Sequence, residues 1–227
     1  MPRTRQTIDI GSIVFASFAA ILYSSWPLGN VLDPIANRGL ASNLGALGRP
    51  YNWLFMLLDI VSGAVVLAVA LRLFERKQLR RQWLINWSII GYGLFGVLTA
   101  LDAVLPLDCV EVVQQCGALT HHPLIILHGL ASLGSIASLT ISIVGFWYLL
   151  GFNRRISRLL RGFLLGVVLT WFGFGVTTGV LLLENRTSAL AQHLFIVICS
   201  LWIAALPYVV FRARGGPDLL SEKVTVR

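Results

Sequence analysis

Five ionisable residues interrupt the long apolar stretches of this chain, and with one serine they are the candidates for chemistry. They are Asp59, Asp102, His128, Glu184 and His193, with Ser24 on the first stretch. A charged group inside membrane hydrocarbon costs free energy unless it is paired or hydrated, so such residues mark candidate functional sites. Counted at about 1.5 Å of helix per residue, they lie within roughly 12 Å of the outer surface. We predict that they line one polar ligand-binding cavity open to the exoplasmic side or the outer leaflet.

Histidine and carboxylate side chains are also ligands that zinc prefers, and a catalytic zinc site needs three of them to converge. Asp102, His128 and His193 would be the three ligands. Candidates for a fourth ligand are Asp59, Glu184, His121 and His122. Zinc held there would activate a water for attack on an ester or amide of an outer-leaflet lipid, with a carboxylate as general base. Because no two histidines lie one helical turn apart, we expect no cofactor and keep zinc as the alternative.

A different interpretation is that these side chains only link helices to one another. Each would then be satisfied by a serine, a threonine or a backbone group of a neighbouring helix. A carboxylate is a costly link inside lipid when asparagine or serine would serve, and this favours a role toward a substrate, an ion or a proton.

The elements that must position these residues follow from composition and length. The 227 residues are 56% hydrophobic and only 12% charged, with a mean hydropathy of +0.78, which is too apolar for an ordinary soluble domain. Backbone groups have no water to bond in lipid, so apolar stretches of about 20 residues cross the membrane as helices. We predict an all-α bundle of six transmembrane helices in one domain, 1–227. The predicted spans are 10–26, 51–74, 83–106, 123–150, 163–183 and 188–211.

The basic residues give the orientation. The net charge is +8, and most arginines and lysines fall before the first span, in alternate loops and after the last span. Under the positive-inside rule both termini are cytoplasmic, and we expect a multi-pass protein of the plasma membrane, specifically a bacterial cytoplasmic membrane. The basic loops are short and carry no aromatic platform, so we exclude nucleic acid as a partner.

Polar and small residues recur at helical spacing. The fourth span carries a stripe that should face protein rather than lipid: His128, Ser132, Ser135, Ser138 and Ser142. Small-residue pairs such as Gly162 with Gly166, and Gly175 with Gly179, predict close helix packing. The long connection 27–50 could fold over the outer mouth as a lid.

Cys109 and Cys116 fall in the predicted exoplasmic loop after the third span, whereas Cys199 lies inside the sixth. In an oxidising compartment we expect the loop pair to form a disulfide that fixes the loop over the bundle. A redox-active pair is the alternative, although the two-residue spacing usual for such motifs is absent.

Two stretches resemble a known family. The run Ser42-Asn43-Leu44-Gly45-Ala46-Leu47-Gly48-Arg49-Pro50, leading into Trp53-Leu54-Phe55, is the first, and Leu105-Pro106-Leu107-Asp108 followed by His122 and His128 is the second. Together they resemble the six-helix bacterial membrane family catalogued as domain of unknown function 998. The resemblance implies the architecture and an exoplasmic polar motif, but no mechanism.

A second similarity is to the ceramidase and progestin-receptor-like hydrolase superfamily, whose members combine serine, aspartate and histidine around zinc. Ser24, Asp102, His128 and His193 would correspond to that set. This chain departs from that pattern because it has six predicted spans instead of seven and no His-x-x-x-His pair on the last one.

Three functions follow from these observations. The first is an integral membrane protein that binds or moves a lipid or small amphiphile at the polar layer, with membrane lipids as its partners. The second is a zinc-dependent hydrolase of outer-leaflet lipids. The third is an accessory subunit, whose partner would be a larger membrane complex or a second copy of the chain.

Overall fold

The computed structural model describes residues 9–75, 83–105, 107, 123–152, 158–183 and 189–213. Within these ranges every regular element is helical and no strand is present. The elements are α1 (Ile10–Tyr23), η1 (Trp26–Leu28), α2 (Gly29–Leu32), η2 (Ala36–Arg38), η3 (Ala41–Gly45), α3 (Asn52–Glu75), α4 (Trp83–Val104), α5 (Pro123–Phe152), α6 (Arg158–Leu183) and α7 (Ala189–Ala213). The prediction of an all-α polytopic bundle is confirmed.

The predicted spans start and end close to the observed helices. Five stretches of the described chain are long and apolar enough to cross a membrane: Ile10–Leu32, Asn52–Glu75, Trp83–Val104, Pro123–Trp147 and Ala189–Arg212. The predicted span 163–183 falls on α6, which already begins at Arg158 and whose described apolar part, Arg161–Thr177, is shorter. Apolar length therefore located each long helix.

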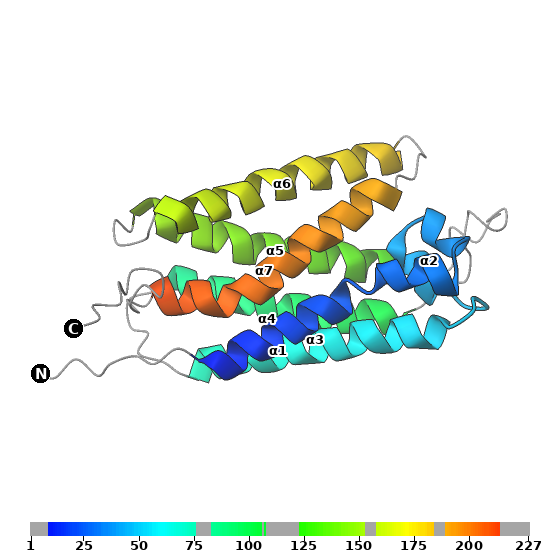
Figure 1. The fold of residues 1–227 in the computed structure, drawn as a ribbon, viewed down its shortest axis with the longest axis horizontal. Coiled ribbons are helices and arrows are strands. Elements are labelled where there is room, and N and C mark those ends of the chain that lie inside the picture. The colour runs from blue at the N-terminus through cyan, green and yellow to red at the C-terminus, as the bar shows by residue number, and fades with distance from the viewer. Residues whose placement is uncertain are drawn as a thin grey trace, which may run out of the picture.

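The long helices run side by side, and both chain termini lie at the same end of the molecule (Figure 1). Helix α4 packs between α3 and α5, α1 packs on α3 and α7, and α6 packs mainly on α7. The short helices η1, α2, η2 and η3 gather at the opposite end, where α1 finishes and α3 begins (Figure 1). Under the predicted orientation, that opposite end is the exoplasmic one.

Helix α4 packs closely on both α3 and α5 at glycine residues. A methyl group added to Gly63 would collide with the carbonyl oxygen of Gly96, and one added to Gly96 would collide with the carbonyl oxygen of Gly63. Gly91 lies equally close to the backbone of α5, at Ser138 and Ser142. Only a residue without a Cβ allows these backbones to approach so closely.

The small-residue prediction is not supported for the pair Gly162 and Gly166, and Gly179 of the second pair has no described side-chain surroundings. A Cβ added to Gly162 or Gly166 of α6 would have no described atom within 4 Å, so this pair does not mark a close helix contact. A Cβ on Gly175 would make only an ordinary contact, 3.6 Å from the ring of Phe195. A four-residue spacing of glycines permits close packing, but it does not show whether another helix lies against that face.

Hydrogen bonds between side chains and neighbouring helices join the bundle across its width. Ser62 Oγ donates to the Ala19 carbonyl oxygen at 2.9 Å and joins α3 to α1. Tyr92 OH donates to the carbonyl oxygen of Ile203 at 3.1 Å, joining α4 to α7. Trp202 Nε1 donates to Ser142 Oγ at 3.0 Å, joining α7 to α5. These donors are therefore satisfied without water, as the interior of a membrane requires.

We expect Gly63→Val to lower the free energy of unfolding by about 1–3 kcal/mol, because the new side chain must push α3 away from α4. Thermal unfolding of the purified protein in detergent would measure it. The matched control is Gly166→Val, for which a change below about 0.5 kcal/mol is expected. Equal effects of the two substitutions would contradict the close contact at Gly63.

Candidate functional site

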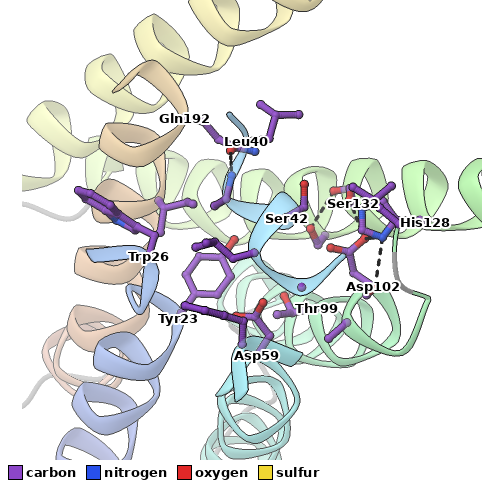
Figure 2. Close-up of a pocket in the computed structure, with 18 of the residues that line it drawn as sticks. Tyr23, Trp26, Leu40, Ser42, Asp59, Thr99, Asp102, His128, Ser132 and Gln192 are labelled. Carbon is purple, nitrogen blue, oxygen red and sulfur yellow. Dashed lines mark hydrogen bonds and ion pairs between the residues drawn. The ribbon is translucent and has the colours of Figure 1, made fainter. Parts of the chain in front are cut away.

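A cavity of about 620 Å³ lies at the end of the bundle that carries the short helices. Its walls come from the end of α1, the first turns of α3, α5 and α7, the last turns of α4, one residue of α6, and the segment 40–45 (Figure 2). Three of the predicted site residues line it, namely Asp59, Asp102 and His128. The antiparallel order of the helices is what gathers residues so far apart in sequence at one end.

Of the other predicted site residues, the structure describes Ser24 and His193, and neither is among the residues that line the cavity. Ser24 Oγ is 2.7 Å from Ser200 Oγ on α7. The His193 ring is buried and stacks on Trp26, with 4.0 Å between the ring centroids. Trp26 itself lines the cavity, so His193 supports this wall from behind. Glu184, His121 and His122 lie outside the described residues, as do Cys109 and Cys116.

Asp102 and His128 form the corner where α4 ends and α5 begins. Asp102 Oδ1 accepts a hydrogen bond from Ser132 Oγ at 2.6 Å and lies 3.2 Å from His128 Nδ1. The same Nδ1 is 2.8 Å from the Leu105 carbonyl oxygen and 3.2 Å from the Asp102 carbonyl oxygen. Every one of these partners is an acceptor, so Nδ1 carries a hydrogen. His128 thereby satisfies carbonyl groups that the end of α4 leaves without helical partners.

Asp59 has a different environment. It lies on α3, about 10 Å from the first residue of the helix at the usual rise, and its side chain lies beside Tyr23 (Figure 2). No hydrogen bond joins its carboxylate to any residue that the structure describes, whereas Asp102 has two partners. The two acids in one cavity therefore differ: Asp102 is engaged by α5, and Asp59 faces the cavity without such a partner.

The described residues offer a pair of metal ligands rather than a set. Within the described ranges no three histidine, cysteine, aspartate or glutamate side chains come together to hold an ion. Asp102 and His128 are adjacent, but His193 is stacked on Trp26. The convergence that zinc catalysis needs is therefore absent from this part of the chain.

The sequence predicted a lid over residues 27–50, but it did not predict the short helices of this segment or the hydrogen bonds that hold it. The predicted lid contains η1, α2, η2 and η3, and two residues outside it, Leu107 after α4 and Gln192 on α7, accept hydrogen bonds from its backbone. The backbone N–H of Ala41 donates to Gln192 Oε1 at 2.6 Å, and the N–H of Leu47 donates to the Leu107 carbonyl oxygen at 2.8 Å. The position of Gln192, next to His193 at the start of an apolar span, was the signal that could have identified it.

One ion pair fastens this lid internally. Arg49 donates to Asp33 through Nε at 2.8 Å and through a terminal nitrogen at 2.5 Å, and the Ala36 N–H donates to the same carboxylate at 3.2 Å. The side chains of Asp33 and Arg49 are only 3% and 16% exposed. Burial by itself would raise the pKa of Asp33, but the hydrogen bonds and charge of Arg49 outweigh it and hold that pKa below its ordinary value of 3.8.

Comparison with protein-family models matches residues 10–207 to the family described as "Protein of unknown function (DUF998)". No curated protein and no solved structure matches the chain. The matched range includes every residue that lines the cavity. The match therefore covers the whole candidate site but names no ligand for it.

We expect Arg49→Gln to lower the free energy of unfolding by roughly 1.5–3 kcal/mol, because Asp33 then stays buried without its charged donor. Thermal unfolding, with hydrogen exchange over residues 27–50, would measure the loss. Arg38→Gln is the matched control, since Arg38 is exposed on the same lid.

The same pair predicts a pH dependence. The folded-state pKa of Asp33 is lowered, so its contribution to stability is complete above the ordinary value of 3.8 and is lost as the pH falls through the lowered value. Wild type and Arg49→Gln should converge in stability below that pH. A constant difference down to the most acid conditions would contradict the role of the ion pair.

At the corner of α4 and α5, we expect Ser132→Ala to destabilise the protein by roughly 1.5–3 kcal/mol, because Asp102 loses a charge-assisted donor. Ser135→Ala is the control: it lines the same cavity, but its hydroxyl donates only to the Ser132 carbonyl oxygen of its own helix. Unfolding curves of the two variants, each compared with wild type, measure the two losses of stability. An effect of Ser135→Ala as large as that of Ser132→Ala would show that the Asp102 contact carries no special weight.

Proposed function

The chain belongs to the DUF998 family, an assignment that names no activity, and from its cavity we propose that this integral membrane protein binds a lipid or another small amphiphile. The single observation that carries the proposal is the mixed polar and apolar lining of the cavity. Carboxylate, imidazole and hydroxyl groups line it: Asp59, Thr99, Asp102, His128 and Ser132. Hydrocarbon side chains line it as well, with Phe55, Leu133, Ile136, Phe195 and Ile196 among them.

Such a lining matches a molecule that has a polar head and an apolar body. Small-molecule sites are mostly apolar cavities of about 300–1,000 Å³ with a few polar groups that fix orientation, and this cavity falls in that range. A purely structural role would leave the polar groups paired with one another. That description fits Ser132 and Asp102, but it does not fit Asp59 or Thr99, whose hydroxyl has no described partner.

The placement of the cavity supports access from the membrane. It lies at one end of helices whose outward faces carry exposed apolar side chains such as Leu57, Leu101 and Leu130. Arginine and lysine are concentrated toward the opposite end of the helices, which supports an exoplasmic position for the cavity. We accordingly assign the protein to the plasma membrane, with an amphiphile of the outer leaflet as the molecule it binds or moves.

We expect Gly129→Phe to abolish binding while leaving the fold intact. Gly129 lines the cavity, and a Cβ added there meets no described atom within 4 Å, so the phenyl ring would occupy ligand space rather than displace protein. The measurement is the amount of lipid and other amphiphile that remains with the purified protein, by mass spectrometry. Gly166→Phe, a similarly unobstructed glycine away from the cavity, controls for lipid bound to the outer surface.

The expected result is a selective loss of one or more species from Gly129→Phe and an unchanged profile from Gly166→Phe. Thermal unfolding of both variants confirms that each is folded. Identical profiles for wild type and Gly129→Phe would contradict the proposed function.

A further inference from the structure

The lining of the cavity contains more acidic than basic side chains. Two carboxylates and one imidazole are among the described lining residues, and neither lysine nor arginine is. The arginines of the lid do not compensate, because Arg49 is engaged by Asp33 and Arg38 is exposed at the surface. His128 lies beside Asp102, so a head group with a negative charge would meet the Asp59 carboxylate without a described counter-ion, whereas a positive one would be stabilised.

Of the two acids, Asp59 is the one available to such a ligand. Asp102 already receives the hydroxyl of Ser132 and lies beside His128 Nδ1. The Asp59 carboxylate has no hydrogen-bond donor among the residues described, and it points into the space between α1, α3 and α4 (Figure 2).

Thr99 supplies a second and independent observation. Its side chain is 6% exposed and lines the same cavity, yet its Oγ1 has no hydrogen-bond partner within the described part of the chain. The hydroxyls of three other threonines in the apolar helices donate a hydrogen bond to a carbonyl oxygen of their own helix. Thr140 donates to Ile136, Thr170 to Gly166 and Thr177 to Gly173. The Thr99 oxygen thus has unused lone pairs as well as an unused hydrogen, and an N–H or O–H group of a ligand in the cavity would give the lone pairs a donor.

Two aromatic rings line the same cavity. Tyr23 lies beside Asp59 (Figure 2), and Trp26, whose ring stacks on His193, lines another part of the wall. Aromatic faces attract cations, most strongly where water is excluded. The Asp59 carboxylate and the aromatic rings therefore favour a cationic head group, and the Thr99 hydroxyl favours one that can donate a hydrogen bond.

We propose that the cavity selects an amphiphile whose head is an ammonium group bearing N–H, with Asp59 as its counter-ion and Thr99 Oγ1 as a hydrogen-bond acceptor. This inference rests on the proposed function and specifies the ligand class for the same site. A long-chain primary amine and the ethanolamine head of a lipid share this chemistry. A quaternary ammonium does not, because it cannot donate to Thr99.

The test uses the full-length protein in phosphatidylcholine nanodiscs and a twelve-carbon primary amine with a photoactivatable diazirine in its tail. Cross-linked peptides are mapped by mass spectrometry, and unlabelled competitors of equal chain length are added: dodecylamine, dodecyltrimethylammonium, dodecanol and dodecanoate. We expect labelling within the cavity and competition by dodecylamine at roughly tenfold lower concentration than by dodecanol. Lysophosphatidylethanolamine is a further competitor, and its strength relative to dodecylamine tells a lipid head from a free amine.

Two variants tie the preference to the named atoms. Asp59→Asn should abolish the advantage of dodecylamine over dodecanol while labelling by a diazirine-bearing dodecanol persists. Thr99→Val should narrow the advantage of dodecylamine over dodecyltrimethylammonium, with Thr177→Val as the matched control that leaves it unchanged. If Asp59→Asn fails to fold, the Thr99 pair carries the test.

The outcomes separate this inference from the proposal beneath it. Equal competition by dodecanol and dodecylamine, or an amine preference that survives in Asp59→Asn, would overturn the ammonium site and leave amphiphile binding standing. Absence of cavity labelling by both the amine and the alcohol would overturn the proposed function itself.

Discussion

A polar group inside a membrane needs a partner, and the arrangement of this bundle follows from how each group obtains one. Across most of the bundle the partner belongs to the next helix. Ser62 bonds the backbone of α1, Tyr92 bonds the backbone of α7, and Trp202 bonds Ser142 of α5. Asp59 and Thr99 break this pattern at one end of the molecule, and both line the cavity. These two exceptions belong to the candidate site, whereas another buried polar group without a described partner, Asn86 Oδ1 near the start of α4, lies outside it.

The other residues around the cavity join the helices and the lid that form its walls. His128 satisfies the end of α4 and lies beside Asp102, so it joins α4 to α5 at the cavity wall. The lid is tied to α7 through Gln192 and to the segment after α4 through Leu107, and its own shape depends on Asp33 and Arg49. Several predicted site residues thus have a structural task. The interpretation that these side chains link helices therefore holds for Asp102 and His128, and the ligand-binding interpretation stays a proposal for Asp59.

Much of the fold could be predicted from the sequence because hydropathy and length determine where helices cross a membrane. Depth along each helix also follows from counting residues, which brought Asp59, Asp102 and His128 correctly to one layer. Rotation about each helix axis does not follow from counting. His193 starts from a similar depth, yet its ring stacks on Trp26, a contact that depends on a 3-10 turn the sequence did not reveal. Gly162 and Gly166 failed for a related reason, since spacing does not identify the neighbouring helix. The disulfide between Cys109 and Cys116 and the role of Glu184 stay predictions.

The most direct measurement is an experimental density map of the protein reconstituted in nanodiscs with a native lipid extract. This account predicts elongated non-protein density inside the cavity, its polar end within hydrogen-bonding distance of Asp59 and Thr99 and its body along Leu133 and Ile136. A cavity closed by protein side chains, with the Asp59 carboxylate bonded to another residue of the chain, would contradict it.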